Sequence, residues 1–296
     1  LVGSEMCIRD RLCRLQGGLF KMSELDILKG HAVNIRKNIV KMVTEAKSGH
    51  PGGSLSSVEI GVALYFTQMD INEENISSLN RDRFVLSKGH ASPLLYSLLA
   101  EKGFLNEEEL LTFRKIGTRL QGHPSMDKLP GVDMSTGSLG QGISAAVGMA
   151  LSNKYHNLPY RIYTLLGDGE CQEGEVWEAA MSASHYGLDN LLAFVDMNGL
   201  QIDGKVSDVM NPFPLDEKFK AFGWNVIVLE DGNDLEAVIK ACEEAKTVKG
   251  KPSVVIAKTV KGKGVSFMEN QSGWHGVAPN KEQCEQALCE LEGGNK

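Results

Sequence analysis

An acidic residue between two glycines stands directly after a short apolar run. Gly167-Asp168-Gly169 follows the run that ends at Leu166, and Asn198 follows the next apolar run, thirty residues after Asp168. If these runs are adjacent parallel strands, Asp168 and Asn198 meet beyond their carboxyl ends, where such sheets bind ligands. A carboxylate, an amide oxygen, a backbone carbonyl and phosphate oxygens suit a hard cation such as Mg²⁺, Ca²⁺ or Mn²⁺. The spacing predicts a metal site made by Asp168, Asn198 and the carbonyl of Leu200.

The glycines of this motif also suit phosphate binding. Small residues let backbone N–H groups approach a phosphate, and the start of the following helix favours negative charge. The motif is not a dinucleotide fingerprint, because Gln172 stands where a glycine is required. It is not a P-loop either, because Glu175 and Val176 stand where lysine and serine or threonine are required. A tight turn with a helix-capping aspartate is the structural alternative.

Four of the seven histidines lie in short glycine-containing loops. Histidine donates hydrogen bonds to phosphate and sugar oxygens, and because it titrates near neutral pH it can also move protons. One such histidine alone has an ordinary structural explanation, but four of them beside a cation motif indicate a catalytic site. The other three, His31, His156 and His185, fall in or beside helical stretches, where a solvated or capping role is expected. The four loop histidines are His50 in Ser48–Gly53, His90 in Ser87–His90, His123 in Gly122–Pro124 and His275 in Trp274–Gly276.

Short apolar strands that alternate with helices must position these loops. Such a pattern is typical of a parallel sheet flanked by helices on both faces, so we expect an α/β fold. We expect a single domain over residues 22–296, and a non-native or disordered leader over residues 1–21, before a natural start at Met22. The tail from Lys281 predicts a surface helix with a frayed end. The predicted strands are 84–87, 163–166, 191–195, 226–229 and 253–257; the predicted helices are 23–47, 57–68, 93–99, 141–153, 176–186, 218–222 and 235–247.

Composition excludes several classes of protein. The 296 residues carry 31 Lys and Arg against 38 Asp and Glu, a net charge of −7, which argues against nucleic acid as a partner. No apolar run approaches the roughly 20 residues of a membrane span, so no membrane partner is expected. The six cysteines are scattered without metal-like spacing and predict reduced thiols in a cytoplasmic protein.

The motif string as a whole resembles one family of enzymes. GDGECQEGEVWEAA over 167–180, followed by NGLQIDG from Asn198, is similar to transketolase. It is less similar to the 2-oxo-acid dehydrogenases and to deoxyxylulose-phosphate synthase. The resemblance covers about residues 24–280 and implies the thiamine-diphosphate-binding fold of the amino-terminal, diphosphate-binding section of a transketolase. It also implies thiamine diphosphate and Mg²⁺ as cofactors.

The resemblance implies roles for individual residues. His90 and His275 would contact the cofactor diphosphate, while His50 and His123 would contact the donor sugar, so that His50, His123 and His275 are the candidate catalytic residues. Gly137 and Leu139 would face the cofactor rings, and Ser138 between them replaces the proline that is commonest there. Glu173 would lie near the cofactor at a subunit contact; its alternative is a solvated glutamate at a helix start. The expected cofactor-binding set is His90, Gly137, Ser138, Leu139, Gly167, Asp168, Gly169, Glu170, Glu173, Asn198, Ile202 and His275.

The resemblance also implies that half of the catalytic machinery lies outside this sequence. In the family, a second domain holds the glutamate that activates the aminopyrimidine ring, the aromatic pocket for that ring, and the arginines that bind the sugar phosphate. We therefore expect the partner to be a carboxy-terminal transketolase subunit, in an assembly of two copies of each chain. The expected reaction moves a two-carbon ketol unit from a ketose phosphate to an aldose phosphate. The tail beyond Leu291 favours a natural stop, and hence a split enzyme, over a fragment.

Three questions stay open at the level of sequence. The chain is an alternative candidate for half of another thiamine-diphosphate enzyme, similar to deoxyxylulose-phosphate synthase or a 2-oxo-acid dehydrogenase. A non-catalytic binding module that retains the fold is the alternative from another class. Lys261-Gly262-Lys263-Gly264 fits a lid near the phosphates and a plain basic loop equally well.

Overall fold

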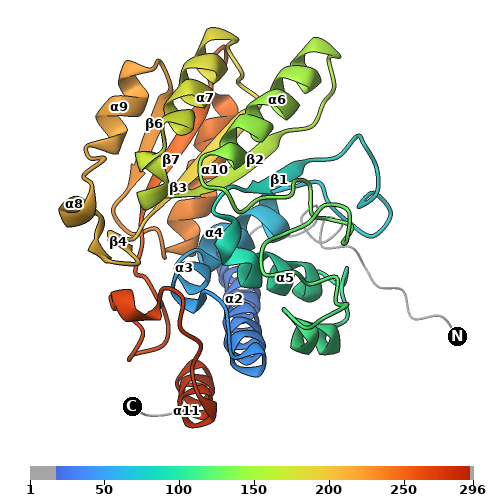
Figure 1. Cartoon of the computed structure of the whole chain (residues 1–296). Coiled ribbons are helices and arrows are strands. Elements are labelled where there is room, and N and C mark those ends of the chain that lie inside the picture. The colour runs from blue at the N-terminus through green and yellow to red at the C-terminus, as the bar shows by residue number, and fades with distance from the viewer. Residues whose placement is uncertain (1–17, 294–296) are drawn as a thin grey trace, which may run out of the picture.

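A five-stranded parallel sheet forms the centre of the molecule (Figure 1). The computed structural model describes residues 18–293, with side chains from Glu24 onward. All four strand pairs are parallel, and the strand order is β1-β2-β3-β7-β6, so the predicted α/β architecture is confirmed. The strands are β1 Arg83–Leu86, β2 Ile162–Gly167, β3 Leu191–Met197, β6 Asn225–Leu229 and β7 Ser253–Lys258.

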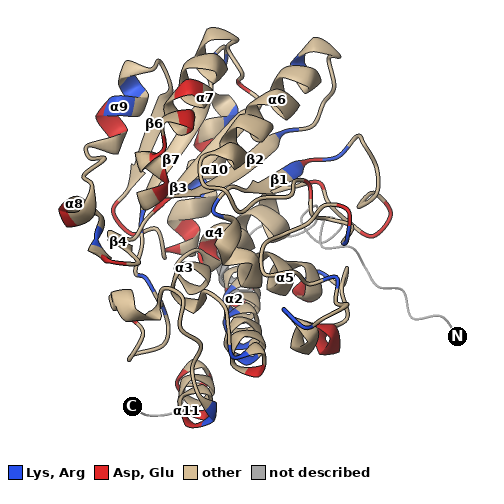
Figure 2. Ribbon diagram, in the orientation of Figure 1, with Lys and Arg blue, Asp and Glu red and all other residues tan. Residues whose placement is uncertain are grey.

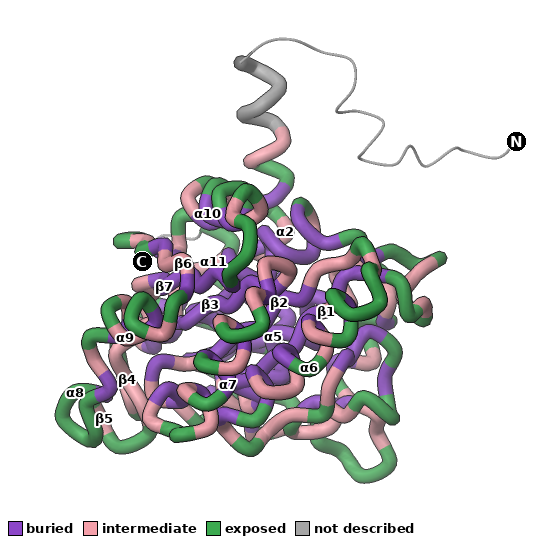
Figure 3. Tube along the Cα trace, turned by 90° about the horizontal axis from the view of Figure 1, so that it is seen from above, coloured by how far each residue is buried: buried purple, intermediate pink, exposed green. Residues whose placement is uncertain are grey.

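Alternate residues of each strand pack against helices on opposite faces of the sheet. In β2, Tyr163 and Leu165 belong to one buried cluster, and Ile162 and Leu166 belong to the other. Helices α2, α4, α5 and α10 build the first cluster, while α6, α7 and α9 build the second. The central strands are accordingly buried on both faces (Figure 3). The bounds are α2 Gly18–Ala46, α4 Val58–Ala63, α5 Ser92–Glu101, α6 Gln141–Tyr155, α7 Gly174–His185, α9 Leu215–Ala221 and α10 Leu235–Thr247.

Short elements complete the loops that carry the predicted site. The stretch Ser48–Gly53 was expected to be a loop, but Pro51 opens a short helix, α3 Pro51–Leu55, because its fixed φ suits the first helical position. A small hairpin of β4 Leu200–Gln201 and β5 Gly204–Lys205 follows Asn198, and short α8 Val206–Val209 comes after it. The two-residue turn of the hairpin is formed by Ile202 and Asp203, and Gly204, which opens β5, has φ +137°, a conformation that favours glycine.

The two ends of the chain relate differently to the predicted boundaries. Residues 1–17 of the expected leader lie outside the described residues, and α2 begins at Gly18, four residues before Met22. The predicted tail helix is present as α11 Lys281–Leu291, which begins with a capping box at Asn280 and packs against α2. Charged residues lie along the outer helices α9 and α11 (Figure 2), a pattern typical of solvated surfaces. Among the described helices, none is both long and apolar enough to cross a membrane.

Candidate active site

The loops that leave the carboxyl ends of the strands surround a cavity of about 270 Å³. Its walls come from the segments after β1, β2, β3 and β7, together with the start of α3. Most of the predicted site residues line it. A larger hollow of about 610 Å³ lies at the amino ends of β1 and β2, beside Asp82 and Arg161, and no predicted site residue lines it. The predicted site residues are therefore gathered at the carboxyl edge of the sheet, where open parallel sheets bind their ligands.

Asp168 and Asn198 meet at this edge, as their spacing predicts. Strands β2 and β3 are adjacent, with Gly167 opposite Asp196. The Asp168 carboxylate accepts hydrogen bonds from the backbone N–H groups of Gly199 (2.6 Å) and Gly169 (2.8 Å). The Asn198 amide nitrogen donates to Asp196 Oδ2 at 2.8 Å, and its Oδ1 accepts from the backbone N–H of Leu200 at 3.1 Å.

The oxygen atoms around Asp168 fit a hard divalent cation. Asp168, Asn198 and Leu200 all line the cavity. In residues 18–293, no group of three or more His, Cys, Asp or Glu side chains could hold a metal, so a cation here would rely on one carboxylate with amide and carbonyl oxygens. Burial, and then the charge of Asp196, raise the pKa of Asp168 to about 6, so a further positive charge beside it would stabilise the ionised carboxylate. Such a donor set suits Mg²⁺ or Ca²⁺ rather than zinc.

This raised pKa leads to a prediction for the cofactor-free protein. A folded-state pKa of about 6, against an ordinary value of 3.8, means that the free energy of unfolding falls as pH rises from about 4 to about 6 and stays lower above it. The loss amounts to about 3 kcal/mol at most. Asp168→Asn cannot ionise and should lose less stability over that range. Thermal unfolding of both proteins between these pH values measures the difference, and parallel curves would contradict the assignment.

The four loop histidines gather at one end of the cavity. The ring centres of His50, His90 and His275 lie 5.2–5.4 Å from one another, and that of His123 lies 6.4 Å from His50. Burial is the main cause that lowers the pKa of each ring, to about 4 for His50 and about 3 for His275. The pKa values of His90 and His123 are lowered as well. The rings are therefore neutral hydrogen-bonding groups at physiological pH.

One of these histidines, His50, has a buried ring nitrogen that a ligand could hydrogen-bond. His50 Nδ1 is buried and finds no hydrogen-bond partner among the described residues. A buried polar atom without a partner is costly, so a bound molecule is the natural source of that hydrogen bond. By contrast, His31 bonds Glu101 at 2.7 Å and stacks on Phe66 outside the site, in keeping with a structural role.

The remaining predicted residues are placed less uniformly. Gly137, Leu139, Glu173 and Ile202 line the cavity, whereas Ser138 is exposed and is absent from its lining. Gly137 has φ +155°, and an added Cβ would lie 3.1 Å from the His123 ring, so only glycine fits there. His123 itself stands exposed at the rim rather than in the lining of the cavity.

Glu170 lines the cavity and is buried beneath several hydrogen-bond donors. Its carboxylate accepts hydrogen bonds from Ser87 Oγ (2.5 Å), Gly140 N (3.0 Å) and Gly167 N (3.0 Å). Both oxygens are thus engaged, and the side chain ties its own Gly167 motif to the segments that carry Ser87 and Gly140. A contact between Glu170 and the cofactor stays a prediction.

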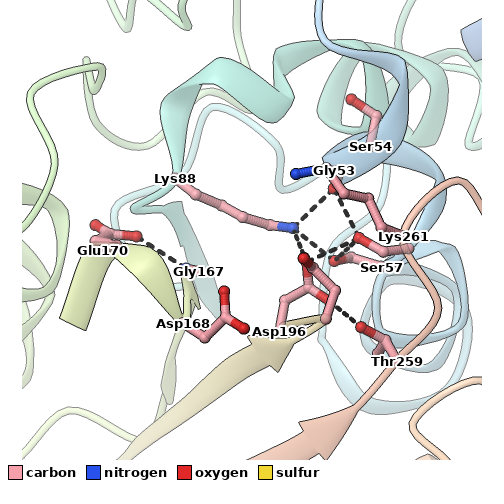
Figure 4. Close-up of polar contacts among 12 residues, drawn as sticks. Gly53, Ser54, Ser57, Lys88, Gly167, Asp168, Glu170, Asp196, Thr259 and Lys261 are labelled. Atoms are coloured by element: carbon pink, nitrogen blue, oxygen red, sulfur yellow. Dashed lines mark hydrogen bonds and ion pairs between the residues drawn. The ribbon is translucent and has the colours of Figure 1, made fainter. Parts of the chain in front are cut away.

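Two charged residues that the sequence motifs did not single out form the floor of the site (Figure 4). Lys88 is 1% exposed and donates to Gly53 O, Ser57 Oγ and Asp196 Oδ2, each at 2.7 Å. Asp196 also accepts from Ser56 Oγ at 2.8 Å, from Thr259 Oγ1 and from the Asn198 amide. Two features of the sequence indicate these residues. Asp196 is an acidic residue inside an apolar strand, and Lys88 belongs to the His90 motif.

Lys261, from the motif that fitted a lid or a basic loop, lies inside the cavity. It is 1% exposed, and its Nζ lies 2.8 Å from Leu200 O and 2.8 Å from His275 Nδ1. Burial lowers the pKa of Lys261 to about 8. Lys261 is therefore a buried residue of the cavity lining, which differs from both a mobile lid and a plain basic surface loop.

The fold and this site together define a parallel α/β domain with a polar, histidine-lined cavity at the carboxyl edge of its sheet. Residues 28–292 match the family described as transketolase, thiamine diphosphate binding domain, and the chain belongs to that family. The resemblance read from the sequence motifs is thereby confirmed.

Known relatives fall into two sizes. The chain is 46% identical to the 6-deoxy-6-sulfo-D-fructose transketolase subunit SqwG of Clostridium sp., over 92% of this chain and 98% of that protein. It is 40% identical to an apulose-4-phosphate transketolase subunit of Phocaeicola vulgatus, over 90% of this chain and 95% of that protein. Human transketolase is 43% identical, but the match spans 90% of this chain and only 42% of that protein.

Solved structures give the same proportions. The transketolase of Campylobacter jejuni superposes with a TM-score of 0.84 at 37% identity, covering 90% of this chain and 43% of that one. The match to a transketolase of Pichia stipitis has a TM-score of 0.84 at 35% identity, and it covers 90% of this chain and 40% of that one. The chain thus spans about two fifths of these structures and nearly the whole length of the relatives named as subunits.

Proposed function

We propose that the chain is the diphosphate-binding subunit of a thiamine-diphosphate-dependent transketolase, which moves a two-carbon ketol unit from a ketose phosphate to an aldose phosphate. The observation that carries this proposal is the cavity at the carboxyl edge, where Asp168, Asn198 and the loop histidines converge in a chain of this family. Two relatives of matching length are themselves named transketolase subunits, which supports an enzyme over a non-catalytic module. The same names weigh against the other thiamine-diphosphate enzymes.

The residues present fit thiamine diphosphate and Mg²⁺, or Ca²⁺ or Mn²⁺ in its place. Asp168, Asn198 and the Leu200 carbonyl would hold the cation, which offsets the charge of the diphosphate in an acidic protein. Gly167, Gly169, His90 and His275 would bind the diphosphate, with Gly137 and Leu139 beside the rings. When bound, the cofactor supplies the nucleophilic carbon that carries the two-carbon unit between sugars.

Three histidines would act on the sugar side of the site. His50, with its unpartnered Nδ1, and His123 at the rim are placed to hydrogen-bond the hydroxyl groups of a sugar. Neutral imidazoles can accept and return protons as the sugar is cleaved and rebuilt. His275, which also lines the cavity, would contact both the diphosphate and the sugar.

The partner in this proposal is a separate carboxy-terminal transketolase subunit, in an assembly of two copies of each. Glu173 would lie near the subunit contact. The relatives of matching length are named for different sugars, one sulfonated and one phosphorylated, which fits a design in which the partner binds the anionic end of the sugar. A cytoplasmic location remains a prediction from the scattered cysteines of the sequence.

The roles of two histidines separate experimentally. His90→Ala should weaken retention of thiamine diphosphate, because His90 lies in the cavity wall beside the rings of His50 and His275. His123→Ala should leave cofactor affinity nearly unchanged and lower kcat/KM for the ketose donor roughly 100-fold or more, as expected for a proton-transfer group. Calorimetric titration and steady-state kinetics of the reconstituted complex give the two quantities.

His31→Ala is the control for this pair, because that histidine bonds Glu101 outside the site. Equal losses of cofactor affinity in His90→Ala and His123→Ala, with turnover by bound cofactor unaffected, would show that the division of roles is wrong.

The proposed function itself is tested by an assay of two-carbon transfer. The chain is mixed with a separate carboxy-terminal transketolase subunit, Mg²⁺, thiamine diphosphate and both sugar phosphates, and the aldose phosphate left after removal of two carbons from the ketose is followed. Product formation that needs both chains and the cofactor supports the proposal. If 2-oxo-acid decarboxylation or deoxyxylulose-phosphate synthesis appears instead, the alternative class of enzyme is correct.

A further inference from the structure

The buried lysine of the Lys261–Gly264 motif has no task in the function proposed above. Lys261 is 1% exposed, and the first turn of α3 closes over its side chain, since a Cβ added to Gly52 would lie 3.1 Å from Lys261 Cγ and Cε. The second lysine of the motif, Lys263, is only half-buried and faces Glu269 at 3.7 Å. Lys263, two positions along the chain and half-buried, is therefore a matched control for the buried Lys261.

The contacts of Lys261 determine where the proton of a neighbouring imidazole resides. Its Nζ lies 2.8 Å from Leu200 O and 2.8 Å from His275 Nδ1. An ammonium group donates hydrogen bonds and accepts none, so both of these atoms must be acceptors. A carbonyl oxygen always accepts, but Nδ1 accepts only when it carries no hydrogen. A neutral imidazole has one N–H, and for His275 it must then be Nε2–H.

The charges around the ring exclude the doubly protonated form. Burial, followed by Lys261, His50 and Lys88, lowers the pKa of His275 to about 3. His50 meets the ring edge-on at 5.4 Å, and His90 stacks on it at 5.2 Å, and both rings are neutral as well. The titratable groups that shift the pKa of His275 are Lys261, His50 and Lys88, and each of them disfavours a second proton. His275 is therefore neutral, with one proton to place.

The opposite nitrogen of the ring is available to a ligand. His275 lines the cavity, and its Nε2 has no hydrogen-bond partner in the part of the chain that the structure describes. An Nε2–H group in this position can donate to an oxygen atom, but it offers no lone pair with which to remove a proton.

We propose that Lys261 is a positioning residue that fixes His275 as the Nε2–H tautomer, so that His275 presents a hydrogen-bond donor, and not a base, to the anionic or hydroxyl oxygens of a molecule in the cavity. The identity of that molecule rests on the proposed function, whereas the tautomer does not. Among the candidate catalytic histidines, this leaves proton removal to His50 and His123 and gives His275 the task of stabilising negative charge on oxygen.

Nitrogen NMR of the full chain tests the tautomer directly. Long-range ¹⁵N–¹H spectra of the cofactor-free protein should show His275 with a bare Nδ1 and a protonated Nε2. Lys261→Met should lose this preference and move the resonances toward a mixture of tautomers. Lys261→Gln keeps an N–H donor without the charge and should retain the tautomer. Lys263→Met is the matched control and should leave the spectrum unchanged.

Kinetics of the complex with its partner give the second measurement. Lys261→Met should lose roughly tenfold to a hundredfold in kcat/KM, the range expected for a hydrogen bond from a charged group, and Lys261→Gln should recover part of the loss. A protonated Nδ1 in the wild-type chain, or an unchanged tautomer in Lys261→Met, would overturn the proposal. If the complex shows no two-carbon transfer, the proposed function fails, but the NMR result still decides the role of Lys261.

Discussion

Asp168→Ala is expected to abolish Mg²⁺-dependent binding of thiamine diphosphate while the fold survives. Asp168 supplies the carboxylate of the predicted cation site, and the other two donors are uncharged oxygens. Loss of an outer partner of a metal site typically costs 10–100-fold in affinity, so loss of the charged ligand should cost more than about 100-fold. The fold should tolerate the change, because burial already disfavours the ionised carboxylate in the cofactor-free chain.

Calorimetric titration with and without Mg²⁺ measures this effect. Asp203→Ala serves as the matched control, since Asp203 lines the same cavity from the exposed turn of the β4–β5 hairpin. Circular dichroism and thermal unfolding establish that both variants are folded. Unchanged cofactor affinity in Asp168→Ala would remove the cation site from this position.

The second large effect is dependence on the partner. Alone, the chain should bind the cofactor weakly and show no two-carbon transfer, because within its described residues no Phe, Tyr or Trp lines the cavity and could cover the cofactor rings. Three exposed apolar side chains lie in or next to lining segments, where a covering subunit would bury them: Ile202 (67%) in the lining, Met210 (64%), whose carbonyl accepts from Gln172 of the lining, and Val277 (56%), two residues after His275. A ligand that bridges two proteins stabilises their complex, so cofactor affinity should rise when the partner is added.

Turnover is measured from a ketose phosphate with each chain alone and with both together. The partner alone is the control for contamination by a full-length enzyme. Light scattering of the active mixture should give the mass of two copies of each chain. Clear turnover by this chain without a second subunit would refute the split enzyme, whereas turnover at another stoichiometry would refute only the two-plus-two assembly.

The sheet and the meeting of Asp168 with Asn198 were predictable from the sequence for one physical reason. Buried parallel strands are short apolar runs, and consecutive runs in such folds are usually neighbours, so the residues that follow them share one edge. The same logic placed His90 after β1 and the Lys261 motif after β7, although it did not reveal what Lys261 does.

The floor of the site was not predictable in this way. Lys88 and Asp196 are 108 positions apart and compensate each other's buried charge. Gly53 and Ser57 complete the hydrogen bonds of Lys88, and Ser56, Thr259 and Asn198 complete those of Asp196. A sequence pattern shows that an acidic residue interrupts an apolar strand, but not which distant lysine compensates it. The side-chain contacts of Glu170 were not predictable for a related reason, because Ser87 and Gly140 lie 83 and 30 positions away in the chain.

The carboxylate of Asp196 has a consequence for how the site responds to change. It receives hydrogen bonds from the end of α3, from the segment after β1, from the Asn198 loop and from the segment after β7. Those segments carry or adjoin His50, His90, the predicted metal ligand Asn198, and Lys261. Effects of substitutions in them will therefore not add, because each also relaxes the other three. The active site behaves as one cooperative element, and engineering it for a new sugar will require changes made in sets.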